Sequence, residues 1–324
     1  MTATRTRVMR RPVHGVLLLD KPLGLSSNQA LQKAKWLLRA EKAGHTGTLD
    51  PLATGVLPLC FGAATKFSGL HLDADKTYAA TLQLGVRTST GDREGEVIER
   101  RAVPALGAHD LERVRQQFLG AICQLPPMHS ALKKDGRALY EYARAGVEVE
   151  RAARTVHIFK LDMALAPVDQ AESAIKIIVQ CSKGTYIRTL GEDIGQALGC
   201  GAHLSALRRL ATGPFDESDC VTLEAFEALT DEQRQACLLA PESLLCDHVP
   251  ITLDNEDAGR FLSGLRRRGP WPDAQRVAVY GQSPRSLLGA AHVKAGELIP
   301  TRLLSPIEIQ QIQQAESVHA TETH

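Results

Sequence analysis

A short run of small and polar residues surrounds one carboxylate. Residues 44–57 read GHTGTLDPLATGVL, with three glycines and a single acidic side chain, Asp50. Glycine adopts backbone angles closed to other residues, and Pro51 fixes its own φ and turns Asp50 away from the α conformation. Leu49 and Leu52 flank this aspartate, so its charge lies against apolar surface and requires a cationic partner. The run predicts a structured loop that holds a carboxylate at a bend.

Composition alone leaves the role of Asp50 open. An aspartate in a loop rich in glycine and proline typically caps the next turn. A phosphate-binding loop is the second candidate, because glycines and threonines recur here. That candidate is disfavoured, because no Gly-Lys-Ser/Thr follows the loop and Asp50 would repel an anion at its centre.

The loop closely resembles the signature loop of the TruB family of tRNA pseudouridine-55 synthases. The resemblance extends in the family's order over roughly residues 14–230, through five further blocks: DKPLGLSS (20–27), KTY (76–78), PPMHSALKKDGRALYEYAR (126–144), CSKGTYIRTL (181–190) and GCGAHLSALRRL (199–210). It implies that the chain isomerises uridine to pseudouridine in the T-loop of tRNA, after flipping the base out of the loop.

The resemblance also assigns roles to residues. Asp50 corresponds to the catalytic nucleophile, and Arg188, in the YIR motif, to the arginine that pairs with it and keeps it ionised. Tyr78 corresponds to the tyrosine that stacks on the target uracil. His45 matches the histidine that fills the place of the flipped base, although a structural or general-base histidine is the alternative.

Further residues are expected to line the uracil pocket or to contact RNA. By resemblance, Tyr186 and the main chain near Leu207 line the pocket. The candidates for RNA contact are the basic residues Lys21, Lys66, Lys133, Lys134, Arg137 and Arg208. For those in the segment 124–152, a plain surface helix is the alternative.

The expected reaction requires neither metal nor cofactor. It breaks the C1′–N1 bond and joins C1′ to C5 without gain or loss of atoms, so one carboxylate and a proton relay suffice. A rival interpretation is an RNA-binding or tRNA-folding module without turnover. A glycosidase-like hydrolase requires two carboxylates, whereas the signature loop supplies one.

Patterns along the chain predict the elements that position these residues. Alternation and apolar runs indicate strands over 14–20, 76–86, 155–165 and 174–181. Ser26 and Gln29 form a capping box that begins a helix, and 63–72 is expected to be helical. Thr185 is the expected N-cap of a helix with Arg188 in its first turn, where a cation opposes the helix dipole and calls for a carboxylate partner.

Length and composition predict an α+β protein of two domains. The chain has 324 residues, 44% of them hydrophobic, and no apolar run near 18 residues. We expect a basic arm (1–13), a pseudouridine synthase domain with a mixed, mostly antiparallel sheet flanked by helices (14–246, with an RNA-contacting insertion about 124–152), a small PUA-like β-barrel (247–310) and a tail (311–324).

Seven scattered cysteines indicate reduced thiols. The expected protein is a cytoplasmic monomer that binds the T-arm stem-loop of tRNA, without a membrane or an obligate protein partner.

Overall fold

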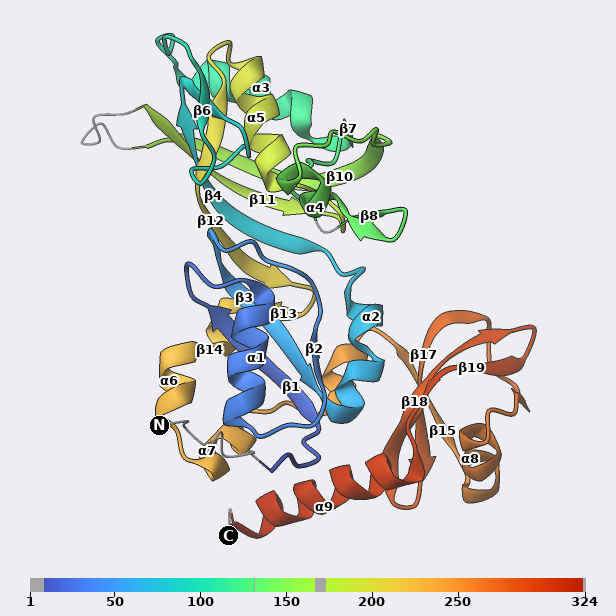
Figure 1. Ribbon diagram of the computed structural model, residues 1–324. Helices are drawn as coiled ribbons and strands as arrows, with labels where there is room; N and C mark the ends of the chain where they lie inside the picture. The colour runs from blue at the N-terminus through green and yellow to red at the C-terminus, as the bar shows by residue number, and fades with distance from the viewer. Residues whose placement is uncertain (1–8, 131, 167–172, 323–324) are drawn as a thin grey trace, which may run out of the picture.

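The computed structural model describes residues 9–130, 132–166 and 173–322, and these form two large β-sheets and two two-stranded ones, β5–β6 and β8–β9, with helices around them (Figure 1). The strands of the larger sheet lie in the order β14-β1-β3-β12-β4-β11-β10-β7, with β13 paired to β12 and β2 to β3. Their bounds are β1 Gly15–Lys21, β2 Ala43–His45, β3 Ala53–Phe61, β4 Lys76–Leu84, β7 Gly120–Gln124, β10 Arg154–Leu165, β11 Ala174–Cys181, β12 Ala202–Thr212, β13 Phe215–Asp216 and β14 Val221–Thr222.

Two long central strands join the halves of this sheet. In Figure 1, β4 and β12 run from the lower part of the molecule, with β1 and β3, into the upper part, with β10 and β11. They pair antiparallel, and Tyr78 lies opposite Arg209. β12 also pairs with β3, in parallel, and Leu207 lies opposite Ala53 there. Since β3 follows the Asp50 loop, that loop is fixed to the middle of the sheet.

Helices cover each half of the larger sheet. α1 (Ser27–Leu37) and α6 (Leu223–Ala228) pack on β1 and β3, around a core that includes Leu17, Leu57 and Phe226. α3 (Ala108–Phe118) and α5 (Ile187–Ala197) pack on the other half, around Leu82 and Leu190. The smaller elements here are η1 Gly62–Lys66, α2 Ser68–His71, β5 Val86–Thr88, β6 Val97–Arg100, β8 Lys133–Lys134, β9 Arg137–Ala138, α4 Leu139–Arg144, η2 Glu217–Asp219, α7 Asp231–Ala236 and η3 Pro241–Leu245.

The second sheet has five strands in the order β15-β17-β18-β19-β16, and it curls into a half-barrel. Its elements are β15 Val249–Leu253, α8 Asn255–Leu262, β16 Arg267–Arg268, β17 Ala274–Gln282, β18 Arg285–Lys294, β19 Glu297–Leu303 and α9 Pro306–Glu322. One apolar cluster joins the two sheets, because Val16 of β1 and Phe67, between η1 and α2, pack with Ala278 and Leu287 of the second sheet. The second sheet therefore packs on the face of β1 and β3 that is opposite to α1 and α6.

The predicted fold class, α+β with a mixed sheet and a small C-terminal β domain, is confirmed. Ser26 forms the expected capping box with Gln29. The predicted N-cap of α5 is wrong by one residue: Tyr186 occupies that position, and the Thr185 hydroxyl instead donates to the carbonyl of Ser182.

Two segments differ from the predictions near the ends of elements. The helix expected over 63–72 is a 3₁₀ turn followed by the short α2. The expected tail is helical as far as Glu322, because α9 begins at Pro306 and packs Ile309 and Ile312 against the cluster between the sheets. Residues 1–8 of the predicted arm lie outside the described residues. No helix in the described ranges is long and apolar enough to cross a membrane.

Gly55 provides a test of how tightly the Asp50 loop is fixed to the sheet. Its φ is +98°, and an added Cβ would lie 2.2 Å from the carbonyl oxygen of Arg209. We expect Gly55→Ala to lower the free energy of unfolding by about 1 to 3 kcal/mol, measured by denaturant titration. Gly44→Ala is the matched control, because a Cβ there meets nothing within 4 Å. Its effect should stay under about 1 kcal/mol. Equal losses in the two variants would contradict this account of the loop.

Candidate active site

The Asp50 loop connects β2 to β3 and is fastened to α1. The hydroxyl of Ser27, buried at the start of α1, accepts from the Leu49 amide at 2.7 Å and donates to the Leu49 carbonyl at 3.0 Å. Leu49 and Leu52 are both buried, as their apolar character predicts. The Asp50 side chain between them is 44% exposed. The loop therefore presents one carboxylate to solvent from a backbone that is held on both sides.

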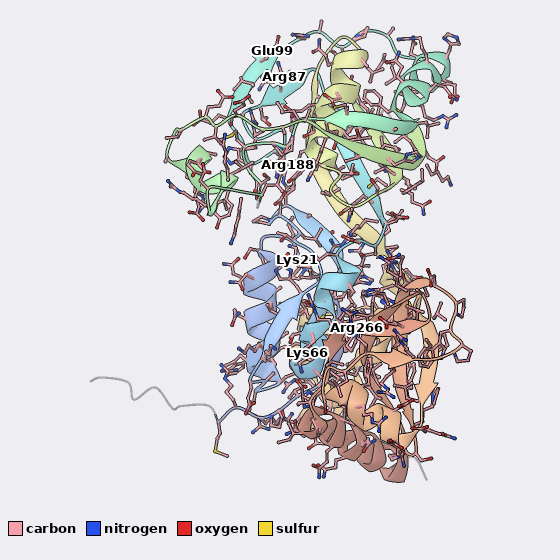
Figure 2. The ribbon with its side chains drawn as sticks, turned by 90° about the vertical axis from the view of Figure 1, so that its right-hand side faces the viewer. Lys21, Lys66, Arg87, Glu99, Arg188 and Arg266 are labelled. Atoms are coloured by element: carbon pink, nitrogen blue, oxygen red, sulfur yellow. The ribbon has the colours of Figure 1, made fainter. Side chains whose placement is uncertain are left out.

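Arg188 is the cationic partner that the sequence called for. Its Nη2 lies 2.9 Å from Oδ2 of Asp50, and its side chain is only 8% exposed. The arginine belongs to the first turn of α5 and lies above Lys21 in Figure 2, whereas the Asp50 loop lies between β2 and β3. The ion pair thus joins the two halves at the point where the carboxylate is accessible.

Three further contacts fix the guanidinium of Arg188. Its Nη1 lies 3.6 Å from Oδ2 of Asp92 and donates to the Thr90 carbonyl at 3.3 Å. Its Nη2 also donates to the His129 carbonyl at 2.6 Å. Two of these contacts come from the turn between β5 and β6 and the third from the segment after β7, so the arginine is oriented whether or not Asp50 moves.

Sequence reasoning missed Asp92. This carboxylate is 4% exposed, and its Oδ1 accepts from the Thr90 hydroxyl at 2.6 Å and from the Glu94 amide at 3.1 Å. It lies in the polar segment TSTGDREG, which signals only a turn. Since its partner Arg188 is distant in the chain, no local pattern could have identified the contact.

Tyr78 lies at the boundary between the two cores of the larger sheet, where it packs against both apolar clusters, as does Leu207. Burial raises the pKa of the Tyr78 phenol, and the nearby positive charge of Arg209 opposes that rise. Arg209, which directly follows the RNA-contact candidate Arg208, was not singled out from the sequence. One signal was available: adjacent residues of a strand point to opposite faces, so one of the two arginines had to face inward.

His45 ends β2, five residues before Asp50 in the chain, and is partly buried. Its Nδ1 is buried and has no hydrogen-bond partner among the described residues. Burial, followed by the charge of Arg209, lowers the pKa of the imidazole. The ring is therefore neutral at physiological pH, which suits stacking rather than ion pairing.

Tyr186 precedes α5 and is held by its main chain. Its amide donates to Oε1 of Gln124 at 3.0 Å, and its carbonyl accepts from Nε2 of Gln124 at 3.3 Å. The guanidinium of Arg154 lies 4.7 Å from the centre of the tyrosine ring. Gln124 is almost fully buried and was not singled out from the sequence. It fixes the backbone directly before Arg188.

The prediction that Lys21 contacts RNA is wrong. Its side chain is fully buried, and its Nζ donates to the carbonyls of Pro22 and Leu25 at 2.9 and 2.5 Å. Burial lowers its pKa to about 8, and the charge of Asp50 opposes this shift. Lys21 therefore supports the backbone and the negative charge of the site from inside the protein.

The other basic candidates fall into two groups. Lys66 and Arg208 are partly buried in ion pairs, Lys66 with Glu308 and Arg208 with Asp20 through both of its terminal nitrogens. The remaining candidates lie on the β8–β9 hairpin of the predicted insertion: Lys133 and Arg137, which are exposed, and Lys134, which is partly buried.

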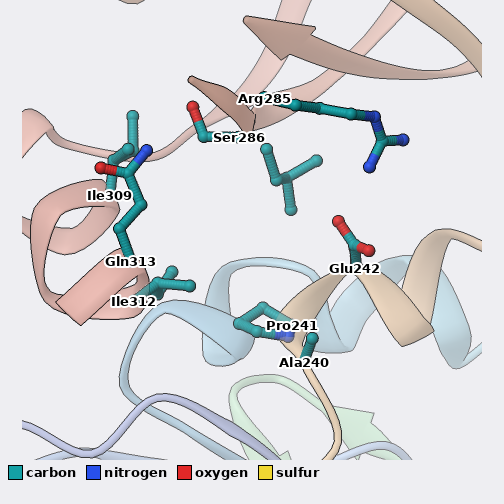
Figure 3. Close-up of a pocket in the computed structure, with 9 residues that line it drawn as sticks. Ala240, Pro241, Glu242, Arg285, Ser286, Ile309, Ile312 and Gln313 are labelled. Carbon is teal, nitrogen blue, oxygen red and sulfur yellow. The ribbon is translucent and has the colours of Figure 1, made fainter. Parts of the chain in front are cut away.

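A cavity of about 160 Å³ lies away from this site, between η3 and the second sheet. Figure 3 shows Ile309, Ile312 and Gln313 of α9 on one side of it, with Pro241 and Glu242 on the other. Its lining includes neither Asp50, nor Arg188, nor Tyr78. It belongs to the contact between the two sheets.

Comparisons with known proteins relate both the sequence and the fold of this chain to pseudouridine synthases. Residues 35–187 match the TruB family pseudouridylate synthase (N terminal domain), and residues 188–246 match the tRNA pseudouridylate synthase B C-terminal domain. The tRNA pseudouridine synthase B of Verminephrobacter eiseniae is 67% identical over 96% of this chain and 94% of its own length. That of Ralstonia nicotianae is 57% identical over 91% and 95%. A solved Cbf5-Nop10-Gar1 complex contains a chain of similar fold, with a TM-score of 0.69 and 24% identity over 91% of this chain and 86% of its own.

Asp50 and Asp92 both contact Arg188, and replacing each in turn tests which carboxylate holds the arginine in place. We expect Asp92→Ala to lower the free energy of unfolding by about 3 to 5 kcal/mol, because it removes the buried partner of a buried cation. Asp50→Ala removes the more exposed partner and should cost no more than about 1 kcal/mol. Denaturant titrations of both variants measure the difference. A loss at Asp50 equal to that at Asp92 would mean that the accessible carboxylate, and not the buried one, holds the arginine.

Proposed function

The chain belongs to the TruB family of pseudouridylate synthases, and we propose that it isomerises uridine to pseudouridine at position 55, in the T-loop of tRNA, with Asp50 as the nucleophile. The protein would act as a monomer on the T-arm stem-loop. The observation that carries the proposal is the contact between Asp50 and Arg188 at 2.9 Å, with the carboxylate half-exposed and the guanidinium buried.

This contact suits a nucleophilic carboxylate. The cation lies 2.9 Å from Oδ2 of Asp50 and fixes the direction of that oxygen, while 44% of the side chain stays exposed to solvent. Because Arg188 is also held by Asp92 and by two backbone carbonyls, it stays in place when Asp50 turns to a substrate. The energetic advantage is preorganisation, since the charges need not rearrange during the reaction.

The proposed chemistry is balanced within the nucleotide. Cleavage of C1′–N1 leaves an electron pair on the uracil, the base rotates, and C5 bonds to C1′. The proton that leaves C5 is matched by one gained at N1. Asp50 supports this by attack at C1′, by addition at C6 or by removal of the C2′ proton, and the geometry is compatible with each route. Tyr78 would stack on the base and relay a proton.

The target uridine must leave the folded loop before it can react, at a cost of a few kcal/mol of stacking. We propose that the neutral ring of His45 fills the vacated place. The main chain of Tyr186 and Leu207 would line the pocket for the flipped base. RNA phosphates would be bound by the β8–β9 hairpin, where the guanidinium of Arg137 lies 4.8 Å from the ring centre of Tyr142.

The competing classes make different demands on the site. A hydrolase needs a second carboxylate flanking the bond, but the Asp92 side chain is 5% exposed and engaged by Arg188. A binding module without turnover needs no accessible ion pair. Incubation of the full chain with unmodified tRNA, followed by pseudouridine-specific chemical labelling, distinguishes them. We expect a single labelled uridine in the T-loop and none when that uridine is replaced by cytidine. Tight binding without product would favour the binding module.

Asp50→Ala should abolish product formation and leave tRNA affinity within about tenfold, or about 1.4 kcal/mol, because phosphate contacts dominate binding. Asp50→Asn, which keeps the shape of the side chain, should be equally inactive. Single-turnover rates at saturating tRNA and filter binding measure the two effects. Residual turnover of a few per cent in either variant would exclude Asp50 as the nucleophile.

His45→Ala should slow the reaction but not stop it. The bound state loses stacking of about 1 to 3 kcal/mol while the reacting groups remain. The same single-turnover assay should therefore give a reduced, measurable rate with both tRNA and the T-arm stem-loop. If the loss equalled that of Asp50→Ala, His45 would be a catalytic group.

A further inference from the structure

Arg209 is a fully buried arginine beneath the proposed site. Its side chain is 1% exposed and is among the largest fully buried side chains of the described residues. It lies on β12, opposite Gly55 of β3 and opposite Tyr78 of β4. Because directly opposed residues of neighbouring strands project to the same face, Arg209 and Tyr78 share a face of the sheet.

The charge of Arg209 is poorly compensated. Its Nε donates to the Val56 carbonyl at 2.6 Å, whereas its Nη2 is buried without a hydrogen-bond partner. Within the described ranges, none of the ion pairs closer than 4.0 Å involves Arg209. A buried ion in such surroundings destabilises a fold, and an apolar residue of similar size is often neutral or stabilising in its place. Stability alone therefore does not account for an arginine here.

The Asp50 loop wraps around Arg209. Near the start of the loop, a Cβ added at Gly47 would lie 3.6 Å from Nη1 of the guanidinium. After the loop, Gly55 packs on the backbone of Arg209, where an added Cβ would lie 2.2 Å from its carbonyl oxygen. Both glycines have positive φ, so the backbone bends tightly over the arginine at each end of the loop.

We propose that Arg209 is a positioning residue for the reaction, whose buried guanidinium supports the Asp50 loop from beneath and holds Tyr78 in its catalytic orientation. This inference rests on the proposed function of the same site. Arg209 touches no substrate in this account. It acts through Asp50, whose loop it shapes, and through Tyr78, whose hydroxyl it faces.

The charge of Arg209 also acts on other groups of the site. Burial raises the pKa of Tyr78, and the charge of Arg209 opposes this rise. The opposing charge makes it easier for the phenol to give up its proton. It adds to the effect of burial in lowering the pKa of His45. Lys21 and Lys76 are the other buried cations close to it, and burial is the main cause of the lowered pKa of each, about 8 in both. Arg209 thus favours a neutral His45 and a reactive Tyr78.

The test compares Arg209→Met, which removes the charge, with Arg209→Lys, which keeps it. At saturating T-arm RNA we expect Arg209→Met to lower the single-turnover rate at least about tenfold, with RNA affinity within about twofold. Its Tm should be unchanged or higher. Arg209→Lys, which keeps the charge, should have a rate between those of Arg209→Met and wild type. If Arg209→Met does not fold, the rate of Arg209→Lys relative to wild type is the test.

Arg234→Met is the matched control for loss of an internal guanidinium. Arg234 is 14% exposed and bonded to Asp231 and to the carbonyls of Phe226 and Glu227 near α7. This variant should lower Tm without lowering the rate. The proposal is overturned if Arg209→Met keeps the wild-type rate, or if both Arg209 variants lose rate only in proportion to a fall in Tm.

A titration separates this proposal from the proposed function, because it needs no turnover. The His45 imidazole, identified in NMR spectra by its absence from His45→Ala, should show a higher pKa in Arg209→Met than in wild type, since a cation that opposes its protonation has gone. Arg209→Lys should leave the pKa low. An unchanged His45 pKa in Arg209→Met would contradict the coupling. A wild-type chain that makes no pseudouridine would instead contradict the proposed function, whatever the titration gives.

Discussion

The ion pair between Arg188 and Asp50 joins two parts of the chain that have separate hydrophobic cores. Asp50 belongs to a loop between β2 and β3, over the core that includes Leu57, and Arg188 begins α5, over the core that includes Leu190. A cation at the start of a helix opposes the helix dipole, so its position there depends on acceptors from elsewhere. Asp92, Thr90 and His129 supply them. The accessible carboxylate is thereby held by a cation whose orientation is set independently of it.

The sheet explains why this contact can form. β4 and β12 extend through both halves, and the segments that carry Tyr78, Leu207 and Arg209 cross the same central region. The Asp50 loop is tied to that region because β3 follows it and pairs with β12 at Gly55. Long paired strands are stiff compared with loops, so the relative position of the two halves is set by hydrogen bonds between strands. A loop-borne carboxylate gains a defined position in this way.

Local sequence patterns predicted the elements well and the charges poorly. Alternation identified β4, β10 and β11, and the capping box at Ser26 identified α1, because these signals depend on neighbours in the chain. Residues 1–66 contain ten lysines and arginines against three acidic residues, a surplus that is typical of a surface for phosphates. Most of those described are already engaged: Lys21 with backbone carbonyls, Lys33 with Glu227, Arg39 with Asp231 and Lys66 with Glu308. The acidic partners of Lys33, Arg39 and Lys66 lie far along the chain, and a count of charges cannot detect such pairing. The pairing of Asp50 with Arg188 was anticipated only through the family resemblance. Asp92 lies in a segment that signals only a turn, and the inward direction of Arg209 follows only once 202–212 is known to be a strand, so both were missed.

Arg188 and Arg209 show two ways of burying a cation near one carboxylate. Arg188 meets two carboxylates and two carbonyls, so its charge is compensated and its removal leaves Asp92 unpaired in the interior. Arg209 meets one carbonyl and keeps an unpartnered nitrogen. Lys21 and Lys76 are also buried, and the charge of Arg209 contributes to the lowered pKa of each. A buried charge without a partner lowers the stability of the folded chain, and a protein keeps such a destabilising residue where function requires it. In the proposed function, the buried charge of Arg209 would contribute electrostatic preorganisation to the site at the expense of stability in the sheet.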